Sequence, residues 1–197
     1  MKDKKSIFSI IMVNAFLFTI ILLLCSCGGK KIATDINGGF ELKSAMFFEP
    51  DGWYATRLPN TKDMVEFVWD STEKHSGSYS VSIAIDSTHI EDRIAYNWTR
   101  TIPGFEVGDT YTLTGWVKAQ DLNGSAFIVV QCWGDNNNFI KLFTTEIECP
   151  VLGTKDWTMV KTVITVPEGT AELRIRAGIS TPQNIGGKAW FDDITIE

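Results

Sequence analysis

The 197-residue sequence has few of the residues on which catalysis most often depends. It contains two histidines and four cysteines, and no G-x-S-x-G, H-E-x-x-H or zinc-type Cys/His spacing occurs in it. Carboxylates are plentiful, and a glycosidase needs only two of them roughly 5–10 Å apart. Two such pairs are Glu146 with Glu148 and Glu91 with Asp92. Because same-face acids are also common on solvated strands, we expect the protein not to be an enzyme.

Clustered basic residues are also lacking. Lys and Arg number 18 against 24 Asp and Glu, which gives a formal net charge of −6. Proteins bind phosphate backbones through patches of basic residues, and this binding is stronger at low salt concentration. We therefore expect no nucleic-acid partner.

A long apolar run occurs only at the N-terminus. Residues 7–24 follow the basic start MKDKKS and contain Ser9, Asn14 and Thr19 as their only polar residues. The run is just long enough to span a bilayer, and a basic start followed by an apolar stretch also describes a secretory signal. An uncleaved anchor and a cleaved signal are thus the two alternatives.

The stretch LCSC, residues 24–27, resembles the lipobox of bacterial lipoproteins, in which a small residue precedes an invariant cysteine. The resemblance implies cleavage after Ser26 and lipidation of Cys27, and two or three acyl chains hold a protein stably on a membrane. We expect a signal peptide over residues 1–26 and a lipid-anchored tether over residues 27–36. This places the mature protein in the bacterial cell envelope, at the outer membrane or cell surface, with periplasmic and surface orientations both open.

The two remaining cysteines are Cys132 and Cys149. An exported protein favours a disulfide, but the flanking strand patterns form a hairpin with Cys132 near its turn and Cys149 beyond its far end. That separation exceeds the roughly 7 Å limit for bridging. We expect two free thiols, one of them in the core, with a disulfide as the alternative.

Beyond residue 30 the sequence shows the period-two alternation of strands, broken by turns rich in Gly, Pro, Asn and Asp. Eight or nine strands in one domain predict an all-β fold, a two-sheet β-sandwich or jelly roll over residues 37–197. The expected strands are residues 78–85, 93–102, 110–119, 125–133, 139–147, 157–166, 171–179 and 188–196, with a further one at 40–48.

The alternation also separates two faces. In residues 125–133 an aliphatic side, with Ile128 and Val130, opposes a side that carries Gln131 and Trp133. Indole rings stack on the apolar faces of sugar rings, and fixed amide or guanidinium groups bind sugar hydroxyls. The mixed face therefore suits a sugar-binding platform; an ordinary solvent face with covered tryptophans is the alternative.

Six segments occur in the order typical of galactose-binding-like β-sandwiches: NGGFE (37–41), DGW (51–53), HSGSYSVSI (75–83), GDTYTLTGWVKA (108–119), DWTMVKTVITVPEGT (156–170) and AWFDDITI (189–196). They resemble most closely the carbohydrate-binding modules of families four, nine and twenty-two. The resemblance implies a non-catalytic binder of polysaccharide or oligosaccharide, serving separate glycoside hydrolases or transporters. An envelope protein for assembly or adhesion is the alternative.

These modules bind sugar on the concave sheet face or in the loops at one end, and both sites stay open here. We expect Trp157 and Trp190 to be packing residues. The candidate sugar-contacting residues are Trp98, Arg100, Trp116, Gln131, Trp133, Arg174 and Arg176, with Trp53 at one edge.

The resemblance also implies a structural Ca²⁺ that joins the two chain ends. It makes carboxylate ligands of Glu41 and Asp192 and supplies backbone carbonyls from residues 37–39 and 75–78. Asp192 is expected to face inward with Ile194, and Asp193 to face away with Phe191. The alternative is that the acids hydrogen-bond turn amides. The candidate metal-binding residues are Glu41, Asp192, Asn37, His75 and Ser78.

Overall fold

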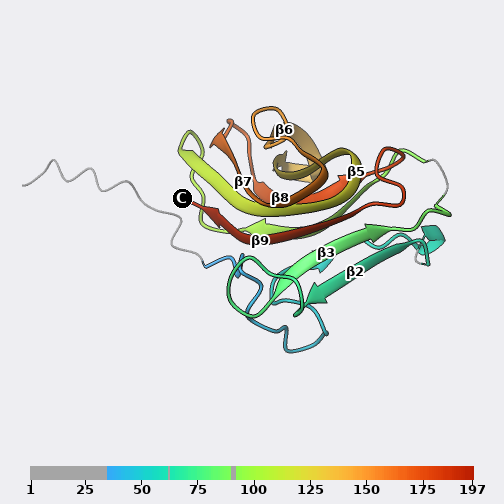
Figure 1. Cartoon of the computed structure of the whole chain (residues 1–197). Helices are drawn as coiled ribbons and strands as arrows, with labels where there is room; N and C mark the ends of the chain where they lie inside the picture. The colour runs from blue at the N-terminus through green and yellow to red at the C-terminus, as the bar shows by residue number, and fades with distance from the viewer. Residues whose placement is uncertain (1–34, 62, 90–91) are drawn as a thin grey trace, which may run out of the picture. The chain divides into compact units, whose positions relative to one another are not determined.

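The computed structural model of the chain describes residues 35–61, 63–89 and 92–197 (Figure 1). The predicted signal peptide, Cys27, Glu91 and most of the tether lie outside the described residues. No helix in the described part has the length and apolar character needed to cross a membrane.

The described residues are almost entirely β-structure, which confirms the predicted all-β fold class. Their only helical segments are two short 3-10 turns, η1 (Pro59–Thr61) and η2 (Asp135–Asn137). The strands are β1 (Tyr54–Ala55), β2 (Val65–Asp70), β3 (Ser80–Ile85), β4 (Ala95–Ile102), β5 (Thr110–Gly134), β6 (Asn138–Thr144), β7 (Val151–Thr165), β8 (Glu172–Ser180) and β9 (Lys188–Ile196).

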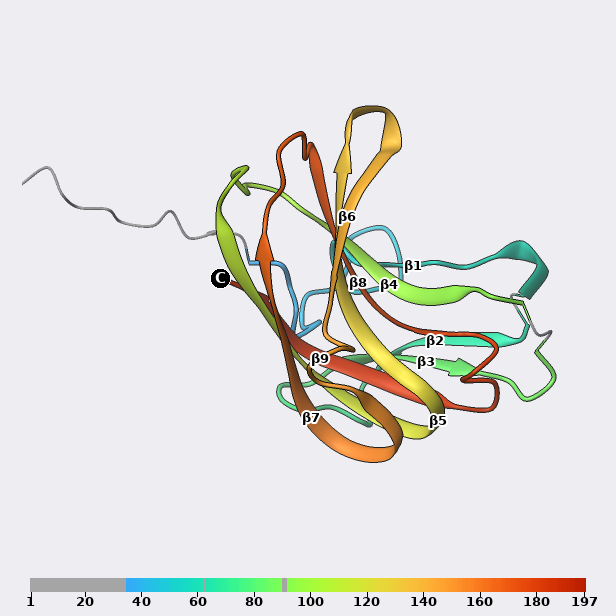
Figure 2. The same ribbon diagram turned by 90° about the horizontal axis from the view of Figure 1, so that it is seen from above.

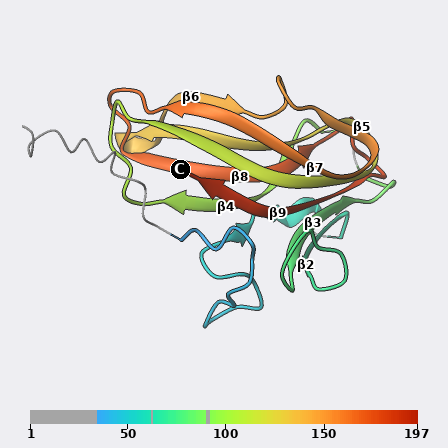
Figure 3. The same cartoon turned by 60° about the vertical axis from the view of Figure 1, so that its left-hand side comes forward.

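Strand β5 joins two antiparallel layers. The strand order is β1-β4-β8-β5-β9-β3-β2, with β6 and β7 also paired to β5. The first half of β5 pairs with β7 and β9, whereas residues 127–134 pair with β8 and β6 (Figure 2). We call the β1-β4-β8-β5-β6 layer the groove sheet and the β2-β3-β9-β5-β7 layer the clasp sheet. Figure 3 shows β6 and β2 on opposite sides of this sandwich.

The core lies between the two sheets. Ile128 and Ile175 of the groove sheet and Ile83 of the clasp sheet are fully buried, because alternate residues of each strand face the opposite layer. Trp98 on β4 crosses this space, since its indole N–H donates to the Ser82 carbonyl on β3 at 3.1 Å. The predicted β-sandwich is confirmed.

Four expected strands differ clearly from the observed ones, one of them because β7 begins at Val151 and not at residue 157. Segments 110–119 and 125–133 form the single strand β5. The backbone between them has a positive φ at Asp121, but β7 remains paired to β5 on both sides of this residue because the register shifts there. Residues 40–48 form no strand and make only an isolated bridge between Lys43 and Pro50. Strand β2 was missed although its residues alternate.

Both predictions for the cysteines are confirmed. Cys132 and Cys149 are free, and Cys132 is buried in the core. Burial raises the pKa of the Cys132 thiol, so this residue acts as a small apolar group rather than a nucleophile.

Candidate functional site

A cleft of about 180 Å³ opens on the outer face of the groove sheet. Register explains its composition, because Val129 on β5 lies opposite Arg176 on β8 and Thr144 on β6, and directly paired residues share a face. Its lining residues are Ala95, Asn97, Phe127, Val129, Gln131, Leu142, Glu146, Arg176 and Ser180. We call this outer surface the groove face.

Trp133 lies on the groove face near the β5–β6 turn. Its indole N–H donates to Gln131 Oε1 at 3.2 Å, and the Phe139 ring meets it edge-on with centroids 5.3 Å apart. The Arg174 guanidinium lies 4.8 Å from the indole centroid. These contacts hold a partly exposed aromatic ring in one orientation, which a stacking platform requires.

Arg174 is itself held by a neighbouring acid. Its Nε and Nη2 donate to the two oxygens of Glu172 at 2.7 and 2.9 Å. The hydrogen bond from Arg174 lowers the pKa of Glu172. This two-point pairing keeps both charges satisfied and fixes Arg174 over the indole.

Tyr54 is a groove-face residue that the sequence analysis missed. It lies opposite Thr99 in the β1–β4 pair and is 48% exposed. It is also close enough to Arg174 and Arg176 to interact electrostatically with both. Alternation gave no signal for it, because β1 has only two residues.

The floor of the cleft is polar. Asn97 is buried, and its side-chain oxygen accepts hydrogen bonds from Thr56 Oγ1 and Thr99 Oγ1 at 3.0 and 2.6 Å. Burial raises the pKa of Glu146, and Thr144 Oγ1 donates to its carboxylate at 3.1 Å. The cleft thus combines fixed polar groups with the apolar side chains of Phe127 and Val129.

The predicted positions of Trp98 and Arg100 were wrong. Trp98 is 1% exposed, between the sheets, and Arg100 Nη1 donates to the Asp51 carbonyl at 2.8 Å on that same inner side. Burial lowers the pKa of Arg100. Alternation along β4 therefore turns Asn97 and Thr99, not the tryptophan and arginine, toward the groove face.

Two more predicted sugar contacts lie elsewhere. The indole N–H of Trp53 donates to the Ile36 and Asn37 carbonyls at 2.9 and 3.0 Å, so this buried ring is structural. Trp116 belongs to the clasp sheet and stacks on His75, with centroids 3.8 Å apart and rings 14° from parallel. The structure brings together on the groove face only the predicted residues Gln131, Trp133, Arg174 and Arg176.

The turn at residues 75–79 is held by carboxylates from both chain ends. Asp192 Oδ2 accepts hydrogen bonds from the His75 and Ser76 amides at 2.8 and 3.1 Å. Glu41 Oε1 accepts from the amides of residues 78 and 79 at 2.8 and 3.0 Å. Asp193 binds the side chains, with Oδ1 2.8 Å from Ser76 Oγ and Oδ2 2.6 Å from His75 Nδ1. We call this arrangement the clasp.

The predicted orientation of the two aspartates needs correction. Asp193 has a φ of 45°, and the β5–β9 register shifts between Thr114 and Trp116, which is the signature of a β-bulge. The bulge reverses the alternation, so Phe191 and Ile194 both enter the core. Asp192 therefore does not share the Ile194 side; it is buried under the 75–79 turn.

The clasp does not fit a calcium ion as it stands. Calcium takes six to eight oxygen ligands, whereas both oxygens of Asp192 accept backbone N–H groups. The carbonyls of Asn37 and Gly38 already accept hydrogen bonds as well. Within residues 35–61, 63–89 and 92–197, no group of three or more His, Cys, Asp or Glu side chains is placed to hold a metal. The structural calcium stays a prediction.

A second buried carboxylate, Asp70, anchors the outer side of the clasp sheet. It accepts hydrogen bonds from the amide and hydroxyl of Thr72, the Glu73 amide and the indole N–H of Trp190. Burial raises its pKa, but these donors outweigh burial and lower the pKa from 3.8 to about 2.

The low pKa of Asp70 predicts a specific acid sensitivity. Because this pKa lies below the unfolded value, the stabilisation is complete above about pH 4 and is lost as the pH falls through 2. We expect Asp70→Asn to cost about 1–2 kcal/mol at pH 7 and to flatten the dependence of unfolding free energy on pH between 2 and 4. Urea unfolding at several pH values measures both.

Asp86 provides the matched control for this prediction. It accepts the same amide and hydroxyl bonds from the threonine two residues later, but it is exposed. Asp86→Asn should change the stability less than Asp70→Asn at every pH. Equal effects of the two variants would contradict the role assigned to Asp70.

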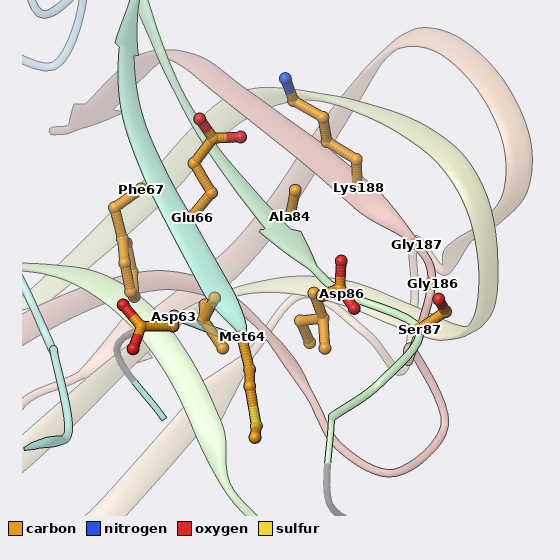
Figure 4. Close-up of a pocket in the computed structure, with 12 residues that line it drawn as sticks. Asp63, Met64, Glu66, Phe67, Ala84, Asp86, Ser87, Gly186, Gly187 and Lys188 are labelled. Atoms are coloured by element: carbon orange, nitrogen blue, oxygen red, sulfur yellow. The ribbon is translucent and has the colours of Figure 1, made fainter. Parts of the chain in front are cut away.

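A larger cleft, about 600 Å³, lies at the edge of the clasp sheet. Figure 4 shows Asp63 and Met64 on one side of it and Asp86 and Ser87 on the other. Its one aromatic lining residue, Phe67, is partly buried and packs edge-on against Trp98. This cleft offers no exposed ring for stacking, so the groove face is the stronger candidate.

Comparisons with solved structures agree with the fold. The CBM22-1 xylan-binding domain of Paenibacillus barcinonensis Xyn10C superposes with a TM-score of 0.55 at 14% identity, covering 81% of this chain and 90% of that one. A structure described as "CBM4 structure and function" superposes with a TM-score of 0.50 at 15% identity, covering 75% and 96%. At such identities the likeness shows the fold alone.

Among curated proteins, tRNA nuclease WapA of Bacillus subtilis strain 168 is 23% identical over 162 residues. The match covers 82% of this chain but only 7% of WapA, so the nuclease activity of that protein does not carry over. The family model described as a carbohydrate binding domain, CBM_4_9, matches residues 36–182. This match spans most of the chain, and the protein therefore belongs to the CBM_4_9 carbohydrate binding domain family.

Proposed function

We propose that the protein is a non-catalytic binder of polysaccharide, with its site on the groove face. The observation that carries this proposal is the placement of two aromatic side chains, Trp133 and Tyr54, on strands β5 and β1 of one sheet face. Three strand spacings, roughly 14 Å, separate those strands. Between them, on strands β4 and β8, lie the Asn97 amide and the Arg176 guanidinium of the cleft.

The distribution of acids supports binding without catalysis. Glycoside hydrolysis needs two free carboxyl groups across the scissile bond. Glu172 is engaged by Arg174, and Glu148, which the sequence pairs with Glu146, does not line the cleft. Glu146 is thus left without a second carboxylate in the cleft.

The proposed location is the cell envelope. The lipobox-like LCSC stretch supports a lipid on Cys27, which would hold the domain near the membrane through a short tether. There the protein would retain glycan for separate glycoside hydrolases or transporters.

Tyr54 provides the first test. In affinity gel electrophoresis with detergent-solubilised full chain, xylan, β-glucan and α-glucan are natural first ligands, and we expect one of them to retard the protein. Tyr54→Ala should weaken that retention about threefold to tenfold, because one aromatic contact is lost. Phe47→Ala, which removes an exposed ring that does not line the cleft and whose neighbour Phe48 packs against Trp69 of the clasp sheet, should leave retention unchanged.

Failure of the unaltered chain to bind any plant, fungal or host glycan would contradict the proposed function. It would favour the second candidate, protein assembly or adhesion, for which one observation speaks. The loop at residues 42–48 exposes Met46, Phe47 and Phe48 by 82%, 63% and 76%, and clustered exposed apolar side chains mark interaction sites. Sedimentation of the chain and of Phe47→Ser would then test self-association.

A further inference from the structure

Arg176 is the one groove-face guanidinium that lacks a counter-ion in the described part of the chain. Its neighbour on β8, Arg174, is paired through two hydrogen bonds with Glu172. Arg176 Nε, by contrast, is shielded from solvent and has no hydrogen-bond partner. The Arg176 side chain nevertheless lines the cleft.

The groups around Arg176 do not neutralise it. Val129 and Thr99 lie opposite it on the flanking strands, and its electrostatic neighbours are Tyr54 and Arg174. Burial lowers its pKa, but an arginine keeps its charge in proteins. Arg176 is partly buried and its Nε has no acceptor, and partly desolvated charges gain from a partner of opposite sign, which a ligand in the cleft would supply.

Glu146 does not serve as the missing partner, although it lines the same cleft. A nearby guanidinium would lower the pKa of a carboxyl group, whereas burial raises the pKa of Glu146 and only Thr144 opposes that rise. The cleft therefore holds an unpaired guanidinium and, apart from it, the carboxyl group of Glu146, whose pKa is raised by burial.

We infer that the groove face binds a glycan bearing uronic acid residues, with the sugar carboxylate paired to the Arg176 guanidinium. This inference rests on the proposed function and specifies its ligand. The planar fork of a guanidinium matches the two oxygens of a carboxylate, and the sugar carboxylate supplies the counter-ion that Arg176 lacks.

The net charge of the whole chain further restricts the class of glycan. The formal net charge is −6, which disfavours a densely charged polyuronate. Charges further apart than about 8 Å are largely screened at physiological salt, so an isolated carboxylate at Arg176 escapes most of this repulsion. The expected ligand is a neutral glycan backbone with spaced uronic acid residues.

A matched pair of polymers tests the inference on the unaltered full chain. Calorimetric titration would compare glucuronoxylan with the same polymer after reduction of its carboxyl groups to alcohols. We expect the reduced polymer to bind about tenfold more weakly, because a charge-assisted hydrogen bond is lost. Equal binding of the two polymers would overturn the inference and leave the proposed function standing. Binding of neither, with retention of the chain by another glycan in the affinity gels, would overturn the inference alone; binding of no glycan at all would overturn both.

Two substitutions test whether Arg176 is the source of the preference for the polymer with uronic acid. Arg176→Gln should bind the two polymers equally, whereas Arg174→Gln, which alters the paired arginine on the same strand, should keep the preference for the uronic acid. A preference that survives in Arg176→Gln would overturn the assignment. Tighter binding of a sulfated galactan than of glucuronoxylan would overturn the choice of carboxylate.

Discussion

Trp133→Ala should weaken polysaccharide binding about thirtyfold, the largest functional effect expected of a single substitution here. Removing a buried aromatic anchor at a binding site commonly costs about 2 kcal/mol. The indole is partly exposed on the groove face and is oriented by Gln131, Phe139 and Arg174. Because the ring is already held in one orientation, binding costs little side-chain entropy. Calorimetric titration of the full chain with its best-bound glycan measures the loss.

Trp116→Ala is the informative comparison. Both tryptophans were predicted from the sequence to contact sugar, but Trp116 stacks on His75 in the clasp. Its removal should lower the melting temperature and leave the affinity for glycan unchanged. Loss of binding in Trp116→Ala with retention in Trp133→Ala would move the site to the clasp sheet.

Asp192→Ala should be among the most destabilising single substitutions in the chain. The carboxylate is 0% exposed and accepts hydrogen bonds from three backbone amides. Its removal leaves those donors unsatisfied, at a net cost of about 3 kcal/mol. Burial, opposed by these amides, raises the pKa of Asp192 to about 6, so part of the gain from the hydrogen bonds is offset by desolvation.

For a domain of this size, about 3 kcal/mol corresponds to a fall of roughly 6–12 °C in the melting temperature, which scanning calorimetry would detect. Asp193→Ala is the matched control, because Asp193 is partly exposed and bonds only side chains of the turn. It should cost about 1 kcal/mol. Equal losses in the two variants would contradict the clasp.

The same scans decide the predicted calcium site. A structural ion stabilises the folded state by mass action. A melting temperature that rises with added calcium and falls with chelator in the unaltered chain, but not in Asp192→Ala, would support the prediction. A melting temperature that is independent of calcium would leave the clasp as a set of carboxylate–amide hydrogen bonds.

The alternation of apolar and polar residues along the sequence was sufficient to predict part of the site. In residues 125–133 and in β8 one side of the strand carries only apolar residues, as with Ile128 and Ile175, so the outward positions of Trp133 and Arg176 followed directly. A side without polar atoms can only face the core, because exposing it to water would forfeit the hydrophobic gain. The all-β class and the free thiols followed from equally local patterns.

Tertiary structure decided the rest. In β4 the face with Tyr96 and Trp98 also carries Arg100, and the packing of Trp98 against β3 shows that this mixed aromatic and charged face is internal. Tyr54 reaches the groove face through a two-residue strand too short to read as a pattern. The bulge at Asp193 reverses the faces of β9 within one residue. Alternation defines two faces of a strand, but contacts with distant strands choose which one is buried, and those contacts arise only when the two sheets meet.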